Sequence, residues 1–262
     1  MKPREVNIDP LSYCAIPLEM YFSETNQKLA DGSGFIYVND NNNFLITNWH
    51  NVTGLDPTTH KPLGAHGGTP DMLKLKLLVQ TKPFIKWKSF GISLYENKEK
   101  QWIEHPVHKE KVDVIALKIT TSILDDSLVR PINNNEFENF KLQVSDDVFI
   151  LGFPYRLKGG GNFPIWKRGS VATEPDLELD GLPKLLVDTA SRPGMSGSLV
   201  IYRRTGLHGL DNGMPTDETI IGNIQGFVGI YSGRIQGKSS HDAQLGIVWK
   251  ASVIDEIIKS SE

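Results

Sequence analysis

The stretch that decides the fold reads Leu73-Lys74-Leu75-Lys76-Leu77-Leu78-Val79-Gln80, residues 73–80. An apolar residue occupies every second position from Leu73 to Val79, and lysine or glutamine fills most of the positions between them. Successive side chains of a β-strand point to opposite faces, so a period of two is typical of a strand with one buried and one solvated face. This segment therefore predicts a strand rather than a helix.

The same pattern recurs along nearly the whole chain. Short apolar or alternating runs are separated by turn-forming residues such as Asn41-Asn42-Asn43 and Gly159-Gly160-Gly161. We therefore predict an all-β fold. The other predicted strands run from Tyr13 to Phe22, Gly34 to Val38, Phe44 to Trp49, Asp113 to Ile119, Val148 to Phe153, Ile165 to Thr173, Lys184 to Asp188, Gly197 to Tyr202, Ile220 to Tyr231 and Gln244 to Trp249.

One helix is expected, at the end of the chain. Ser252 and Asp255, three positions apart, match a capping box ahead of Ile257 and Ile258, and we expect this helix to pack on a barrel. The segment Thr120 to Ser145 has the weakest strand pattern. We place a boundary within it, which gives one β unit over residues 1–130 and a second over residues 131–262.

Composition excludes several classes of protein. The 262 residues include 28 Lys and Arg against 31 Asp and Glu, and the formal net charge is -3 with no long run of either sign. We therefore expect neither nucleic acid nor a membrane as a partner. Apolar stretches such as Val148 to Phe153 are far shorter than the roughly 20 residues that a membrane-spanning helix needs. The single cysteine, Cys14, and the lack of a signal-like apolar start predict a cytoplasmic protein.

A serine flanked by glycines is the candidate nucleophile. Gly194-Met195-Ser196-Gly197-Ser198 directly precedes an apolar strand. In such a tight turn the Ser196 hydroxyl can be exposed while the backbone N–H groups of Gly194 and Ser196 point into the same space, a geometry suited to binding an oxyanion. An ordinary glycine turn is the alternative for this segment taken alone.

A serine hydroxyl is a poor nucleophile at neutral pH and needs a base. Among the seven histidines, His50 is the best candidate, because it follows the predicted strand Phe44 to Trp49. A lone histidine is more often a hydrogen-bonded core residue. Asp113 is the candidate that orients the imidazole, since it begins a strand on the parity of the buried positions, where a carboxylate without a partner is costly.

Three segments together resemble the signature segments of trypsin- and chymotrypsin-like serine proteases, in that family's order of His, Asp and Ser. They are Thr47-Asn48-Trp49-His50, Asp113-Val114-Ile115-Ala116-Leu117 and Gly194-Met195-Ser196-Gly197-Ser198. Gly32-Ser33-Gly34-Phe35 also resembles a segment of the family. The chain is most similar to compact bacterial proteases related to the catalytic domain of the HtrA type, without a following PDZ domain. This resemblance implies two perpendicular six-stranded β-barrels with the site in the cleft between them.

The resemblance also implies a mechanism. Ser196 would attack a peptide carbonyl to form an acyl-enzyme, His50 would move the proton, and Asp113 would orient His50. Gly194 and Ser196 would supply the oxyanion hole, and neither a cofactor nor a metal would be needed. The intact set predicts an active serine endopeptidase. A protease fold kept as a catalytically idle peptide-binding or scaffold module is the alternative.

Two departures from the family pattern bear on activity. Met195 stands where many secreted relatives carry an aspartate that pairs with a new N-terminus, so we expect no activation by such an ion pair. Gly229 stands where many relatives have a serine that supports the catalytic aspartate, so we expect Asp113 to be held less tightly.

Substrate binding is expected at two places. Ala190 replaces the acid of trypsin-like members, which predicts small or medium apolar residues, rather than Arg or Lys, before the scissile bond. The strand around Gly229-Ile230-Tyr231 is expected to pair with an extended peptide, and Tyr231 to narrow the pocket.

Some restraint on cleavage is also expected, because an unrestrained protease is hazardous in the cytosol. A narrow sequence requirement or an activating protein partner would supply it, by ordering the loop Arg156 to Asn162 or the oxyanion turn. His105 and His108 do not predict a metal site, since Pro106 disfavours a helical face and no second cluster is present.

Overall fold

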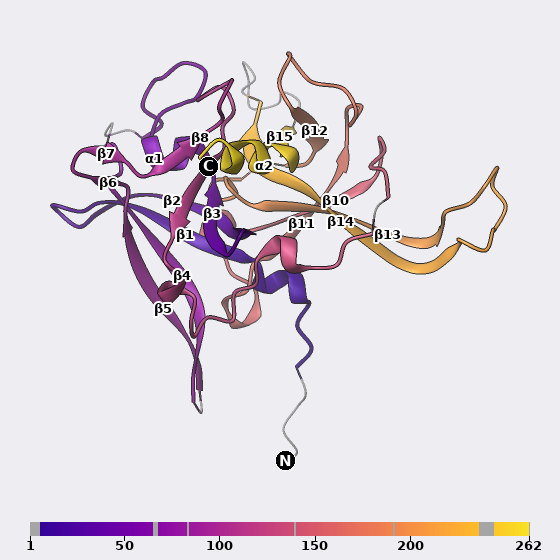
Figure 1. Cartoon of the computed structure of the whole chain (residues 1–262), viewed down its shortest axis with the longest axis horizontal. Coiled ribbons are helices and arrows are strands. Elements are labelled where there is room, and N and C mark those ends of the chain that lie inside the picture. The colour runs from indigo at the N-terminus through magenta and orange to yellow at the C-terminus, as the bar shows by residue number, and fades with distance from the viewer. Residues whose placement is uncertain are drawn as a thin grey trace.

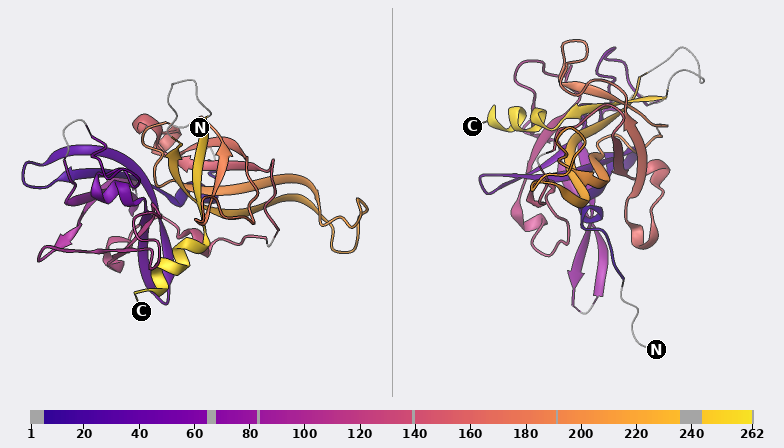
Figure 2. Two further views of the ribbon diagram at one scale, coloured as in Figure 1. Left: turned by 90° about the horizontal axis from the view of Figure 1, so that it is seen from above. Right: turned by 90° about the vertical axis from the view of Figure 1, so that its right-hand side faces the viewer.

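A computed structural model of the chain describes residues 6–64, 68–82, 84–138, 140–190, 192–235 and 244–261. Strands account for most of its regular structure, so the predicted all-β class is confirmed (Figure 1). The strands form two units that follow each other along the chain. The units lie side by side in the left view of Figure 2, with the indigo to magenta unit on the left and the orange one on the right.

The N-terminal unit is a sheet of seven antiparallel strands in the order β5-β4-β1-β2-β3-β9-β8. This unit is a seven-stranded sheet rather than the six-stranded barrel that the resemblance implied, because β5 and β8, from the segment between 84 and 104, form its two outer strands. The bounds are β1 (Ala15–Phe22), β2 (Gln27–Asn39), β3 (Asn42–Thr47), β4 (Met72–Thr81), β5 (Phe84–Ser93), β8 (Trp102–Glu104) and β9 (Ile115–Ile119), with β6 (Tyr95–Glu96) and β7 (Glu99–Lys100) as a separate hairpin.

The C-terminal unit is a closed barrel of six strands in the order β10-β11-β12-β15-β14-β13. Two of these strands extend beyond the barrel as the long hairpin at the right of Figure 1. The predicted boundary at 130/131 falls in the connection between the two units, and their perpendicular arrangement stays a prediction. The bounds are β10 (Asp147–Gly152), β11 (Ile165–Val171), β12 (Lys184–Asp188), β13 (Leu199–His208), β14 (Ile220–Arg234) and β15 (Leu245–Lys250).

A shared apolar core joins the two units. It includes Phe35 and Phe44 from the N-terminal sheet and Leu199 and Ile230 from the barrel, all buried. The side chains that meet between the units are therefore excluded from water, and each aliphatic side chain of this kind contributes about 1.5–3 kcal/mol to stability. The site described below lies where these units meet, on a scaffold that this core holds together.

The C-terminal helix α2 (Ser252–Lys259) connects the barrel with the N-terminal sheet. It follows β15 of the barrel but packs on β8 and β9 of the N-terminal unit, and its isoleucines are buried in the shared core. The predicted capping box does not form, because Ala251 is the N-cap and Ser252 already has a helical position. Asp255 instead accepts a hydrogen bond from the Tyr37 hydroxyl at 2.7 Å. Within the described ranges, no helix is long and apolar enough to cross a membrane.

Candidate active site

His50 lies on α1 (Trp49–Thr53), a helix of five residues that follows β3. The predicted strand up to Trp49 therefore ends earlier, at Thr47. The helix stops at Gly54, whose φ of 71° is left-handed and whose N–H donates to the His50 carbonyl at 2.9 Å. Because the preceding Trp49 is buried, the short helix holds His50 at a fixed place beside the barrel.

Asp113 contacts His50 through both carboxylate oxygens. His50 Nδ1 lies 2.6 Å from Asp113 Oδ2, and the His50 backbone N–H donates to Oδ1 at 2.9 Å. Asp113 is only 2% exposed. A carboxylate on Nδ1 favours the tautomer that carries its proton there, which leaves the Nε2 lone pair for proton transfer.

Ser232, which sequence reasoning missed, supplies a further hydrogen bond to Asp113. Its hydroxyl donates to Asp113 Oδ2 from β14, three residues after Gly229. The expectation that Asp113 is held less tightly because position 229 lacks a hydroxyl is therefore wrong. The supporting serine is present, and the local motif placed it three residues too early.

The turn that carries Ser196 can be built only with glycine at two positions. Gly194 has a φ of +90°, and a Cβ there would lie 2.5 Å from the Phe153 carbonyl oxygen. Gly197 has a φ of +84°, and a Cβ there would lie 2.0 Å from the Ser33 carbonyl oxygen. Since L side chains rarely adopt such angles, both glycines are required for the turn to pack against its neighbours.

Hydrogen bonds from other segments fix the orientation of this turn. Tyr155 N–H donates to the Pro193 carbonyl at 2.8 Å, and Ser33 N–H donates to the Ser196 carbonyl at 2.8 Å. With the Pro193 carbonyl engaged in this way, neither the Gly194 nor the Ser196 N–H has a hydrogen-bond acceptor among the residues that the structure describes.

Ser33 is the second residue that sequence reasoning did not single out for a role. Its fully buried hydroxyl donates to the Gly194 carbonyl at 2.9 Å and accepts from Phe153 N–H at 3.3 Å. Its own carbonyl accepts from Thr47 Oγ1 at 2.8 Å. One residue of the N-terminal sheet therefore contacts both the turn that carries Ser196 and the end of β10. A polar residue between two glycines on an apolar strand was the available signal.

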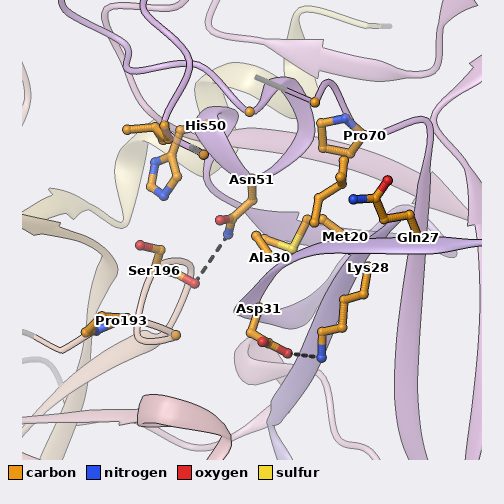
Figure 3. Close-up of a pocket in the computed structure, with 16 residues that line it drawn as sticks. Met20, Gln27, Lys28, Ala30, Asp31, His50, Asn51, Pro70, Pro193 and Ser196 are labelled. Carbon is orange, nitrogen blue, oxygen red and sulfur yellow. Dashed lines mark hydrogen bonds and ion pairs between the residues drawn. The ribbon is translucent and has the colours of Figure 1, made fainter. Parts of the chain in front are cut away.

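His50 and Ser196 line the same pocket, which has a volume of about 340 Å³. Figure 3 shows both side chains at one edge of it, with Asn51 beside them. Asn51 Nδ2 donates to the Ser196 carbonyl at 3.3 Å. The described contacts include no hydrogen bond between Ser196 Oγ and the His50 ring. The structure thus brings the three predicted residues to one place, with the His50–Asp113 contact formed.

Gly229, Ile230 and Tyr231 cannot pair with a substrate as expected. Ile230 is paired with β13 on one edge and with β15 on the other, and Tyr231 is only 1% exposed. Gly229 is required for the packing of β14 against β15, because a Cβ there would lie 1.8 Å from the Trp249 carbonyl oxygen. The unpaired edge begins afterwards, at Ser232–Arg234, where Gly233 and Arg234 pair only with β15 in the described part of the barrel and the register skips Ser232.

Ala190 is partly buried between β12 and the turn that carries Ser196. Its neighbour Ser191 and the segment 236–243 lie outside the described residues. The predicted preference for small or medium apolar residues therefore stays a prediction. Met195 is buried in the apolar core of the barrel.

The two histidines at 105 and 108 form a local cluster next to α2. His105 Nε2 contacts Glu256 Oε2 at 3.0 Å. Burial lowers the pKa of His105, and Glu256 opposes this shift. Over the described ranges, no group of three His, Cys, Asp or Glu side chains could hold a metal ion.

A comparison with solved structures shows that the fold is shared with a known protease. The chain resembles the thermostable serine protease AL20 from an extremophilic microorganism, with 10% sequence identity, a TM-score of 0.51, and coverage of 97% of this chain and 99% of the other. A second similar structure is the inactive form of a serine-to-alanine mutant of Rv3671c from M. tuberculosis H37Rv. It has 15% sequence identity and a TM-score of 0.47, and the match covers 95% of this chain and 86% of the other. No curated protein sequence matches the chain.

The family profile gives the assignment. The profile of the trypsin-like peptidase domain matches residues 32–210, which is more than half of the chain and includes His50, Asp113 and Ser196. The AL20 likeness adds the shared fold. The chain belongs to the trypsin-like peptidase family.

Proposed function

We propose that the chain is a serine endopeptidase in which Ser196 is the nucleophile, His50 the general base and Asp113 the residue that orients the base. One observation carries this proposal: a buried carboxylate contacts His50 through both of its oxygens, at the edge of a pocket that Ser196 also lines. A buried carboxylate is costly unless it is paired, and here its partners are His50 and Ser232.

The reaction follows the mechanism of the family. Ser196 Oγ attacks the carbonyl carbon of the scissile peptide while His50 Nε2 takes the hydroxyl proton. The developing oxyanion accepts hydrogen bonds from the N–H groups of Gly194 and Ser196. The C–N bond then breaks, and His50 gives its proton to the leaving amine. Water, deprotonated by His50, attacks the resulting ester and releases the carboxylic acid, which restores the Ser196 hydroxyl.

The part of the substrate before the scissile bond would lie along Ser232–Arg234. This segment has a strand partner on one edge only within the described barrel, so an extended peptide can add there as a further strand. Ala190 would line the adjoining side-chain pocket and favour a small or medium apolar residue.

Cleavage would be restricted to few protein substrates. The oxyanion turn is held by hydrogen bonds within the chain, and Trp87 Nε1 donates to the Gly161 carbonyl at 3.1 Å, which ties the loop from 156 to 162 to β5. These contacts favour restriction by substrate sequence over a partner that builds the turn. Rapid degradation of unfolded casein by the purified protein alone would contradict any such restriction.

A small activated ester tests the chemistry without depending on the protein substrate. We expect wild type to release nitrophenol from N-acetyl-alanine 4-nitrophenyl ester. His50→Ala, Asp113→Asn and Ser196→Ala should each lower kcat/KM by about 10³-fold or more. Ser198→Ala is the matched control, because this neighbouring hydroxyl is buried and has no hydrogen-bond partner in the described structure. Equal rates in wild type and Ser196→Ala would refute the proposal.

The catalytically idle module is the second candidate. It is favoured by one observation, namely that the described contacts include no Ser196–His50 hydrogen bond. Such contacts are often long in the absence of substrate and tighten when it binds, which is why we prefer the enzyme. An idle module would bind peptides along Ser232–Arg234 yet fail to release nitrophenol.

A further inference from the structure

The pocket beside Ser196 extends into the N-terminal unit, well beyond the side chains of His50 and Ser196. Its volume is about 340 Å³, in the range of pockets that hold whole small ligands. Figure 3 shows Met20 of β1 and Lys28 and Ala30 of β2 on the far side of Asn51 from His50 and Ser196. Most of its apolar wall comes from Met20, Leu29, Ala30, Leu63 and Pro70.

The position of this pocket identifies which half of a substrate would enter it. The part before the scissile bond belongs with Ser232–Arg234 and Ala190, all in the C-terminal unit. The pocket is lined mainly by the N-terminal unit, including His50, and the C-terminal unit adds only Pro193, Gly194 and Ser196. His50 is also the group that gives its proton to the leaving amine. The pocket is therefore on the leaving-group side of the scissile bond.

The charges around the pocket are already paired. Lys28 contacts Asp31, as the dashed line in Figure 3 shows, and its Nζ also lies 2.7 Å from Glu19 Oε1. A charged substrate side chain in the pocket would lose hydration without gaining an unpaired partner from this cluster, which is unfavourable. An apolar side chain would instead gain from burial against the apolar wall.

Two residues of the pocket lining, Met20 and Asn51, pack closely against Gly32. A Cβ at Gly32 would lie 2.8 Å from Met20 Cε and 2.9 Å from Asn51 Nδ2, so a side chain at position 32 would displace both. Asn51 is 4% exposed, and its amide donates to Thr47 Oγ1 at 2.9 Å as well as to the Ser196 carbonyl. The Nδ2 group of Asn51 is thereby engaged within the protein.

We propose that this pocket binds a large apolar side chain, of leucine or phenylalanine size, from the first residue after the scissile bond. This inference rests on the proposed function and adds to it the leaving-group specificity. The acyl-side preference set at Ala190 is independent of it.

Acyl transfer measures this specificity separately from acylation. Wild type is acylated by N-acetyl-alanine 4-nitrophenyl ester, and the acyl-enzyme then divides between water and an added amine. An attacking amine forms the new amide bond, breaks the ester to Ser196, and passes its proton through His50 to the serine oxygen. By microscopic reversibility the amine occupies the leaving-group side. Leucine amide, glycine amide and aspartic acid α-amide are compared at equal concentration.

We expect leucine amide to give a ratio of transfer to hydrolysis about 10-fold or more above that of glycine amide, since an apolar pocket discriminates a few methylenes by about 10- to 200-fold. Aspartic acid α-amide should do no better than glycine amide. Equal ratios for leucine and glycine amides, with normal nitrophenol release, would overturn this inference and leave the proposed function standing. Without nitrophenol release from wild type, the proposed function itself fails and the inference with it.

Variants locate the effect in the pocket. Ala30→Phe adds a ring at an exposed position of the pocket lining and should remove most of the leucine preference, measured as the ratio of transfer to hydrolysis. Leu63→Ser replaces apolar wall by a smaller polar side chain and should lower the preference too. Ala172→Phe is the matched control, because it makes the same substitution at an exposed alanine outside the pocket. It should change neither the leucine preference nor the rate of nitrophenol release. An unchanged leucine preference in both Ala30→Phe and Leu63→Ser would contradict the assignment.

Discussion

Replacing Ser33 by alanine tests whether its hydroxyl positions the turn at residues 194–197, which carries Ser196. The substitution leaves the Cβ in place and removes one hydroxyl, which is fully buried and has two partners, the Gly194 carbonyl at 2.9 Å and Phe153 N–H at 3.3 Å. Both partners then lose a hydrogen bond in a place without exposed solvent. Because an unsatisfied buried polar group costs about 1–3 kcal/mol, we expect Ser33→Ala to lower the free energy of unfolding by about 2–4 kcal/mol.

The effect on catalysis follows from what the hydroxyl holds. Gly194 provides one of the two proposed oxyanion donors, and loss of such a donor outright costs about 10²–10³ in rate. Ser33 acts on the donor through the adjoining carbonyl, so a smaller loss of about 10- to 100-fold in kcat is expected, or about 1.4–2.7 kcal/mol. KM should change little, because the oxyanion forms only in the transition state.

Steady-state hydrolysis of the nitrophenyl ester separates kcat from KM, and urea unfolding gives the stability. Ser198→Ala is the matched control, since it removes a buried hydroxyl that has no partner in the described structure and should leave kcat unchanged. A Ser33→Ala enzyme that is destabilised but keeps its wild-type kcat would refute the assigned role in positioning. A parallel rise in KM would point instead to a distorted binding edge.

Three other perturbations give distinct results. Ser232→Ala should lower kcat by about 10- to 100-fold, because it removes a hydrogen bond to a charged group worth about 1.5–3 kcal/mol, and an unchanged kcat would show that Asp113 needs no such support. Burial raises the pKa of Glu19, but its contacts with Lys28 and Lys76 lower it further, to about 2. The stability that Glu19 contributes is therefore present above its unfolded pKa of about 4.3 and is lost as the pH falls toward 2. The difference in free energy of unfolding between wild type and Glu19→Gln, measured by urea unfolding, should shrink as the pH falls over that window. A difference that stays constant with pH would contradict this prediction. Burial raises the pKa of Cys14 to about 11, so iodoacetamide at about pH 8 should modify it only after unfolding, and fast labelling of the native protein would contradict its buried position.

The fold class and the residues that meet at the candidate site could be predicted because their signals are local. The alternation of Leu73 to Val79 follows directly from the pleat of a strand, and β4 contains this segment. The segments around His50 and Ser196 carry compact motifs, and the structure places both residues on one pocket. β5 escaped prediction because both of its faces are largely exposed, which removes the period-two pattern.

The remaining features depend on contacts between segments that are distant in the sequence. No local motif shows that Ser232 faces Asp113 across the two units or that Ser33 contacts Gly194. The substrate edge was placed at Gly229 for the same reason, since the pairing of β14 with β13 and β15 decides which residues keep a free edge. The cytoplasmic location and a gating partner stay predictions.

Covalent labelling by a fluorophosphonate tests the central claim most directly, because it reports whether the Ser196 oxygen is activated. Intact-mass measurement should show one adduct on wild type, and peptide mapping should place it on Ser196. Labelling should be absent in Ser196→Ala and about 10³-fold slower in His50→Ala. A wild-type protein that forms no adduct, or a His50→Ala variant labelled at the wild-type rate, would contradict the account.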